Sequence, residues 1–361
     1  MSRIDQVVIY VQTVQNRKRV VDIVAKSDNV RNADITEISN WLAGNDSQTY
    51  IQFDRENIFF HPLPYGDFAL GIINHPDNNF STSSTSTVSS LNLSQKFFVR
   101  VLIISPSVFF QFANNPIAIY DKLNRDQKLN FIAKPPAKLN PLETPPDKTI
   151  CNTEILKRIV NEIGAVTISR LFQSLLDSVC TIFCPHNLMP PTLILNGIFN
   201  LLPVRFRTEL TFSTAAFLSS DNPFQAVGFS GDSKSAIKLA NDSGASLIDF
   251  EKFRHYRKIP QNIHLDQWSQ LIFSVLSNRD FAFWEYQIKS DAESNYDETV
   301  EFIDWRELND LAIIWRRDYP KKPIIHNTNS AKTVESAEKE LKQSIAAVEK
   351  LLADSKRKPA G

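Results

Sequence analysis

The chain has 361 residues, of which 42% are hydrophobic and 11% aromatic, and this composition excludes a mainly disordered protein. Forty basic residues balance forty acidic ones, so no overall charge draws the chain to nucleic acid or to an anionic membrane. The first thirty residues lack the apolar core of a signal peptide and no run reaches the ~18 apolar residues of a membrane span, which predicts a cytoplasmic protein.

The first part of the chain, residues 1–133, is predicted to be a β-rich domain with short helices. One run, at 97–104, is apolar enough to lie in the centre of a sheet. Asp34 is a capping residue for a predicted helix over 34–42. The prolines after Ser105 and Asn115 predict two further helix starts. The predicted strands are 6–13, 50–53, 97–104 and two within 59–73 that are joined by a turn.

A proline-rich segment follows this part of the chain. Its prolines are Pro135, Pro136, Pro141, Pro145 and Pro146. Because proline cannot continue a helix or donate to a sheet, we predict a linker over 134–150. The linker would separate the β-rich domain from a second domain over 151–325.

The second domain is predicted to be of the α/β type. A helix over 154–177, with a break near Gly164, is followed by a strand over 178–184, a helix over 191–202 and a strand over 208–214. Strand, helix and strand in this order form a βαβ unit, so the two strands should lie parallel, either adjacent or one strand apart. The whole chain is therefore predicted to have an α+β fold. Further elements are predicted at 224–229 (strand), 233–240, 265–277, 281–289 and 301–316 (helices).

The end of the chain carries a regular apolar stripe over 331–357. Its members are Val334, Ala337, Leu341, Ile345, Val348 and Leu352. This spacing predicts an amphipathic helix that needs one partner surface. Three surfaces stay open at this point: the chain's own second domain, a second copy of the chain, and another protein.

Two cysteines and a histidine, Cys180, Cys184 and His186, could be read as zinc ligands. In an extended strand the two cysteines would lie roughly 13 Å apart, too far to share a metal. We therefore expect buried structural cysteines and no metal. The sequence also lacks the glycine patterns that bind phosphates and dinucleotides, so we expect no cofactor.

Arg205, Arg207 and Glu209 alternate along the predicted strand over 208–214 and its entrance. In extended backbone they would project from one face, where two arginines could bind an anion. The interpretation that we favour is a structural site, in which the arginines contact main-chain carbonyls and Glu209.

Three segments carry a resemblance to a known family. They are Phe60-His61-Pro62-Leu63-Pro64-Tyr65-Gly66-Asp67-Phe68-Ala69-Leu70, Phe112-Ala113-Asn114-Asn115-Pro116-Ile117-Ala118 and Leu202-Pro203-Val204-Arg205-Phe206-Arg207-Thr208-Glu209-Leu210-Thr211-Phe212-Ser213-Thr214. In this order they resemble the GTPase-associated proteins of bacterial conflict systems, as found in planctomycetes, and the resemblance covers about residues 5–290. It implies a non-catalytic adaptor or sensor that acts with a GTPase, and it supplies no catalytic residues.

We therefore expect a non-catalytic protein that acts by protein–protein interaction. Self-association through the helix over 331–357 is a further possibility for its partners. The alternative is an enzyme of the hydrolase type, with a site built between the two domains from His61, Cys184 or His186. A cleft that gathers a histidine, a cysteine and a carboxylate within hydrogen-bond reach would favour the enzyme.

Overall fold

The computed structural model of the chain shows helices together with a mixed sheet, so the predicted α+β class is confirmed. Residues 1–318 form one compact unit, and residues 319–361 form a second. The predicted helix over 331–357 and the predicted strand over 50–53 lie outside the described residues. The structure describes residues 1–13, 19–43, 57–74, 96–130, 136–185, 189–214, 224–229, 232–253, 264–294 and 304–319.

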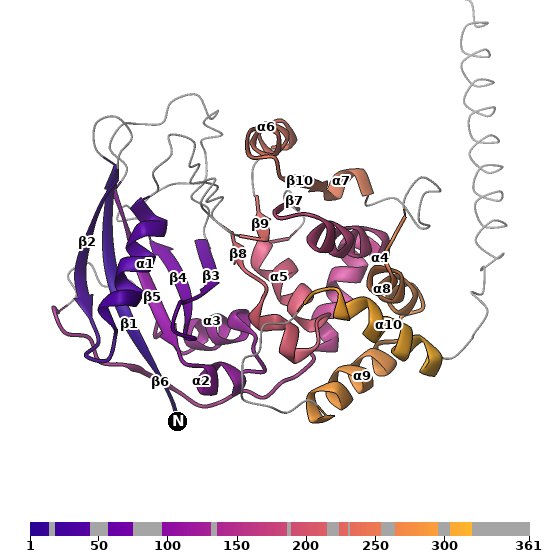
Figure 1. Cartoon of the computed structure of the whole chain (residues 1–361), viewed down its shortest axis with the longest axis horizontal. Helices are drawn as coiled ribbons and strands as arrows, with labels where there is room; N and C mark the ends of the chain where they lie inside the picture. The colour runs from indigo at the N-terminus through magenta and orange to yellow at the C-terminus, as the bar shows by residue number, and fades with distance from the viewer. Residues whose placement is uncertain are drawn as a thin grey trace, which may run out of the picture. The chain divides into compact units, whose positions relative to one another are not determined.

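A single sheet runs through the first unit (Figure 1). Its strand order is β10-β7-β9-β8-β3-β4-β5-β1-β2, and β6 pairs with β1 away from this path. The strands are β1 Ser2–Thr13, β2 Arg19–Lys26, β3 Asn57–Pro62, β4 Phe68–Asn74, β5 Lys96–Ile104, β6 Leu142–Thr144, β7 Thr181–Cys184, β8 Phe212–Ser213, β9 Ala226–Gly228 and β10 Ser246–Asp249.

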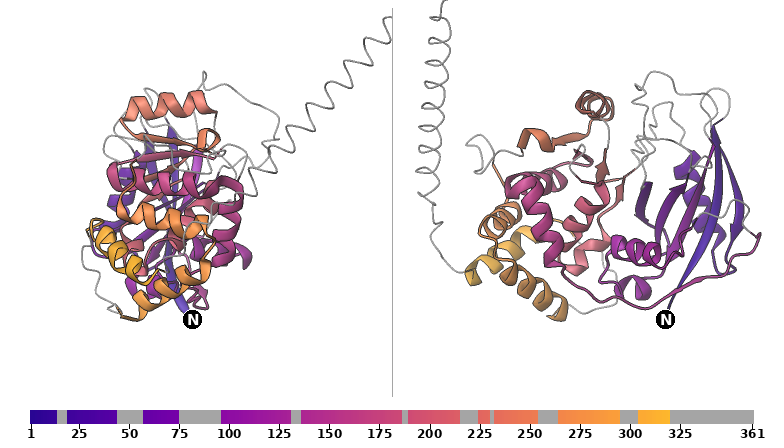
Figure 2. Two further views of the ribbon diagram at one scale, coloured as in Figure 1. Left: turned by 90° about the vertical axis from the view of Figure 1, so that its right-hand side faces the viewer. Right: turned by 180° about the vertical axis from the view of Figure 1, so that it is seen from behind.

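Helices lie on both faces of this sheet, as two views show (Figures 1 and 2). None of the helices in the described ranges combines the length and the apolar character that a bilayer crossing requires. The helices are α1 Asn32–Ala43, α2 Pro106–Phe110, α3 Pro116–Arg125, α4 Thr153–Asp177, α5 Pro191–Asn200, α6 Ser233–Ser243, α7 Phe250–Phe253, α8 Gln267–Ser277, α9 Phe281–Ser294, α10 Glu307–Asp318 and the 3₁₀ helix η2 Val204–Thr208.

The first half of the chain forms antiparallel strands. Strand β5 lies between β4 and β1, so the central strand predicted at 97–104 is confirmed. Six consecutive residues of this strand, from Val99 to Ile104, are buried, which explains its nearly continuous apolar sequence. The predicted helix starts are confirmed too: Ser105 and Asn115 cap α2 and α3 with their side-chain oxygens.

The second half contributes parallel strands, and the βαβ prediction is confirmed. Strand β9 lies between β7 and β8 and pairs in parallel with both, so β7 and β8 are parallel and one strand apart. The predicted break in the preceding helix is also present. Gly164 has φ 80° and ψ 154° inside α4, a conformation that glycine adopts without steric cost.

The predicted division into two domains at 134–150 is wrong. Strand β3 of the first half pairs with β8 of the second half, so one sheet includes both. The proline-rich segment pairs with the first half of the chain: β6 binds β1, and the main chain of Lys26 bonds with Ala137 and Leu139. Prolines exclude a helix here but still permit extended chain that pairs at intervals, which sequence alone did not distinguish from a linker.

Aromatic and aliphatic side chains cover the two faces of the sheet. On one face, α1 and α6 share a core with the sheet that includes Ile38, Phe59 and Val227. On the other face, Phe60 packs against Phe109 of α2. A separate cluster joins the three last described helices, because Trp268, Trp284 and Trp315 have ring centroids within 5.6 Å of one another.

Candidate functional site

The predicted strand over 208–214 is mostly a loop with a two-residue strand, and a 3₁₀ helix leads into it, which changes the arginine prediction. Residues Val204–Thr208 form η2, and only Phe212–Ser213 belongs to a strand. Arg205 and Arg207 therefore do not project from one extended face. Arg205 instead pairs with Glu307 of α10 at 3.2 Å, and its guanidinium lies over the ring of Phe206.

Arg207 is a structural residue in the interior. Its side chain is fully buried and donates to the carbonyl oxygens of Leu202, Ala113 and Ile150, at 3.0, 2.8 and 2.7 Å. The expected carbonyl contacts are thus present, whereas the described residues show no ion pair between Arg207 and Glu209. Burial lowers the pKa of Arg207 to about 10, so the guanidinium stays charged at pH 7. The hypothesis of an anion site has no support here.

The second and third segments of the family resemblance meet around this arginine. Asn114 Nδ2 donates to the carbonyl of Val204 at 3.1 Å, and Asn115 Nδ2 donates to Asn196 Oδ1 at 3.2 Å. Ala113 and Asn114 both have positive φ, 50° and 52°, an unusual conformation for non-glycine residues. The side chains in these contacts are buried, so most of these two segments serves the fold, while Arg205 and Glu209 are partly exposed.

The described histidine and cysteine of the enzyme alternative lie far apart. Phe60, Phe212, Ala226 and Thr181 stand in one row across β3, β8, β9 and β7. His61 lies one residue from this row, toward the N-terminal ends of β8, β9 and β7, because β3 runs antiparallel to them. Cys184 lies three residues from the row in the opposite direction, at the C-terminal end of β7. The two are therefore separated by roughly 13 Å along the strands and roughly 14 Å across them.

Two of the three cysteines, Cys151 and Cys180, show no sign of activation. Burial raises the pKa of Cys151 and Cys180 to about 11, so both thiols are protonated at pH 7. Among the described residues, no group of three His, Cys, Asp or Glu side chains could hold a metal ion. His186, the third member of the predicted cluster, lies outside the described residues.

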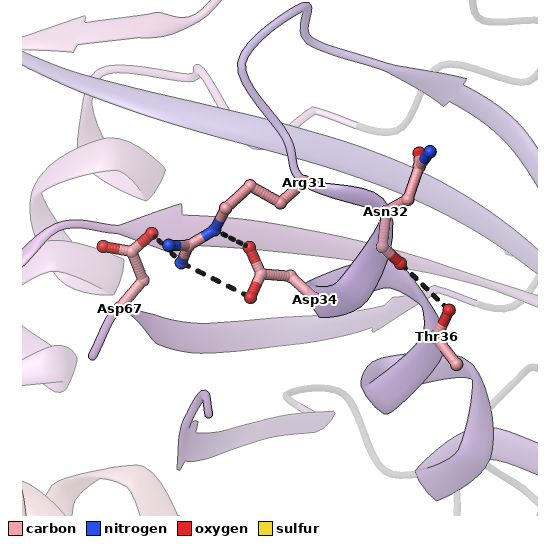
Figure 3. A network of polar contacts seen from close by, with 5 residues as sticks. All are labelled: Arg31, Asn32, Asp34, Thr36 and Asp67. Carbon is pink, nitrogen blue, oxygen red and sulfur yellow. Dashed lines mark hydrogen bonds and ion pairs between the residues drawn. The ribbon is translucent and has the colours of Figure 1, made fainter. Parts of the chain in front are cut away.

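The first segment of the resemblance does reach the surface, at the turn between β3 and β4. Tyr65 of this turn is 63% exposed, and the guanidinium of Arg31 lies 5.0 Å from the centre of its ring. Arg31 Nε binds Asp34 Oδ2 at 2.8 Å, and its Nη2 binds Asp67 Oδ2 at 2.7 Å (Figure 3). We call Arg31, Tyr65 and Asp67, together with the buried Asp34 that binds Arg31, the α1–turn surface.

This surface is built by helix α1 and the turn together. The helix begins at Asn32, so Asp34 lies within its first turn and binds Arg31, and does not cap the helix as predicted. Thr36 Oγ1 donates to the carbonyl of Asn32 and closes the first turn, as Figure 3 shows. Partial burial raises the pKa of Asp67, and the charge of Arg31 opposes this shift.

A second group of side chains lies toward the other end of α1. The ring of His61 stands 4.6 Å from that of Trp41 and 6.1 Å from that of Phe224. Its Nδ1 is 2.6 Å from the carbonyl oxygen of Pro62, and Trp41 Nε1 donates to Glu37 Oε1 at 2.9 Å. His61 could be singled out from the sequence, whereas Trp41 and Glu37 were not. The four-residue spacing of Glu37 and Trp41 could have indicated their contact, because it places both on one helix face.

Comparison with known proteins adds no assignment to this geometry. No protein-family model matches the chain, and the curated proteins include no match to it.

Proposed function

We propose that this protein is a non-catalytic binding module whose α1–turn surface contacts a partner protein. The observation that carries the proposal is an exposed tyrosine ring held against an arginine whose own position is set by two carboxylates. Tyrosine and arginine are enriched among the residues that contribute most to protein–protein binding. Because Arg31 is already fixed by Asp34 and Asp67, its ordering costs little entropy when a partner binds.

The absence of activated groups in the described ranges supports binding over catalysis. His61 and Cys184 lie three strands apart in the sheet, on β3 and β7, and the thiols of Cys151 and Cys180 are protonated at pH 7. Arg207, the most deeply buried arginine of the predicted cluster, is bound to main-chain carbonyls. In the part of the chain that the structure describes, these arrangements keep His61 away from Cys184 and use Arg207 for folding.

The proposed partner is a GTPase encoded beside this protein, as the resemblance to GTPase-associated proteins implies. The genomic neighbourhood of the reading frame is the first thing to examine. If a GTPase gene lies there, the two purified proteins can be mixed and their affinity measured by calorimetry. The proposal expects binding without turnover of the nucleotide by the protein described here.

Substitution of Tyr65 tests the surface itself. Tyr65→Ala should weaken binding by about tenfold or more, which is usual for an exposed aromatic at the centre of an interface. The matched control is Tyr286→Ala, because Tyr286 of α9 is 67% exposed and lies on another element. Equal affinities for the wild type and Tyr65→Ala would show that the partner binds elsewhere.

A further inference from the structure

The ring of His61 packs against an aromatic ring of helix α1 and against one in the segment that leads into β9. Its neighbour in the sheet, Ala69, belongs to the core shared with α1, and Trp41 packs against the same core. The imidazole thus lies between the rings of Trp41 and Phe224. This contact links α1 to the sheet at the end opposite to Arg31.

The hydrogen bonds around the imidazole assign its tautomer. Nδ1 must carry the proton, because its neighbour at 2.6 Å is the carbonyl oxygen of Pro62, which can only accept. Nε2 is therefore the unprotonated nitrogen of a neutral ring. It is buried, and the described residues offer it no hydrogen-bond partner.

The charged groups near this ring come from α1 and its surroundings. Glu37 acts on His61 from α1, while its Oε1 accepts from Trp41 Nε1. Arg19 of β2 reaches the carbonyl of Leu42 at the end of the same helix, and Asp67 is bound by Arg31. Strand β4 and the segment before β9 present uncharged neighbours, Ala69 and Phe224.

We propose that His61, Trp41 and Glu37 form a proton-sensitive contact that releases the end of α1 when His61 takes up a proton. Nε2 receives this proton from solvent, and no covalent bond other than the new N–H forms or breaks. The new N–H is a buried donor that needs an acceptor. The described residues place no acceptor within hydrogen-bond reach of Nε2, so the carboxylate of Glu37 can accept the new N–H only if its side chain, and with it the end of α1, moves. This inference does not depend on the proposed partner.

The pH range follows from the surroundings of the ring. Burial lowers the pKa of His61 below its ordinary value of 6.5, and the Pro62 carbonyl and the charge of Glu37 oppose this shift. The unfolded chain therefore binds the proton at a higher pH than the folded chain does. The contribution of the neutral ring to stability is complete above pH 6.5 and is lost as the pH falls from 6.5 through the lower folded pKa.

Fluorine NMR of the full chain labelled with 5-fluorotryptophan measures this movement directly. The chain has five tryptophans, and Trp41→Phe assigns the signal of interest. We expect the Trp41 signal to shift with a midpoint below pH 6.5, together with the Cε1–H signal of His61. A Trp41 signal that stays constant while His61 titrates would overturn the proposal.

Three variants separate protonation from a simple packing role. His61→Asn keeps a side-chain N–H for the Pro62 carbonyl but does not titrate, so the Trp41 transition should disappear. Glu37→Gln keeps an acceptor for Trp41 and removes the charge, which should move the midpoint to lower pH by about half a pH unit. His264→Asn, at an exposed position, is the control and should change neither. Persistence of the transition in His61→Asn would contradict the proposal.

Discussion

The guanidinium of Arg207 donates a hydrogen bond of 2.8 Å to the carbonyl oxygen of Ala113, a residue that lies 94 positions earlier in the chain. This bond holds together two of the three segments that resemble GTPase-associated proteins. Arg207 also donates to the carbonyl oxygen of Ile150, at the end of the proline-rich segment. The most recognisable part of the sequence thus specifies the interior of the fold.

Removal of this arginine should destabilise the protein strongly. Arg207→Ala leaves two buried carbonyl oxygens and one partly buried carbonyl oxygen without their donor, and we expect the free energy of unfolding to fall by about 3 kcal/mol or more. Arg207→Lys should recover only part of this loss, because an ammonium group cannot reproduce the planar fork. Urea denaturation measures both losses.

Arg205→Ala is the control. The ion pair of Arg205 with Glu307 is partly exposed, so its loss should lower the free energy of unfolding by about 1 kcal/mol or less. Equal losses in the two alanine variants would contradict the structural role.

A glycine in β4 is required by the ring that packs against it. A Cβ atom added at Gly71 would overlap the ring of Phe59 on the neighbouring strand. We expect Gly71→Ala to lower the free energy of unfolding by about 1–3 kcal/mol, the usual cost of overpacking a core. Thermal denaturation of the single variants and of Gly71→Ala with Phe59→Leu tests the cause. The double variant should lose less than the sum of the two single losses, and strict additivity would exclude this contact as the reason.

The thiol of Cys180 should react slowly although it is partly exposed. Burial raises its pKa to about 11, so at pH 8 its thiolate is on the order of 100-fold scarcer than that of a free cysteine. Iodoacetamide labelling followed by peptide mass spectrometry measures the rate in the native state. Unfolding in urea should restore ordinary reactivity. Fast native labelling at Cys180 would contradict the raised pKa of this thiol.

Local patterns in the sequence were sufficient for most of the secondary structure. Asn115 followed by proline predicted the start of α3, and the position of Gly164 predicted the break in α4, because caps and glycine act through neighbouring backbone atoms. The parallel arrangement of β7 and β8 was also predictable, since a helix that joins two strands on one face leaves few alternatives.

Contacts between distant segments decided the rest, and the sequence carries no local record of them. Arg207 and Glu209 alternate as a strand pair would, yet three carbonyls from three separate segments hold the backbone around Arg207 in a 3₁₀ helix. The prolines of 134–150 excluded a helix but did not reveal that the segment pairs with β1 and β2. Tyr65 and Arg31 meet only because the residue before α1 lies beside the β3–β4 turn, where Arg31 also binds Asp67. Hydrogen bonds and ring contacts of this kind depend on distances in space, which are set only when the whole sheet has formed.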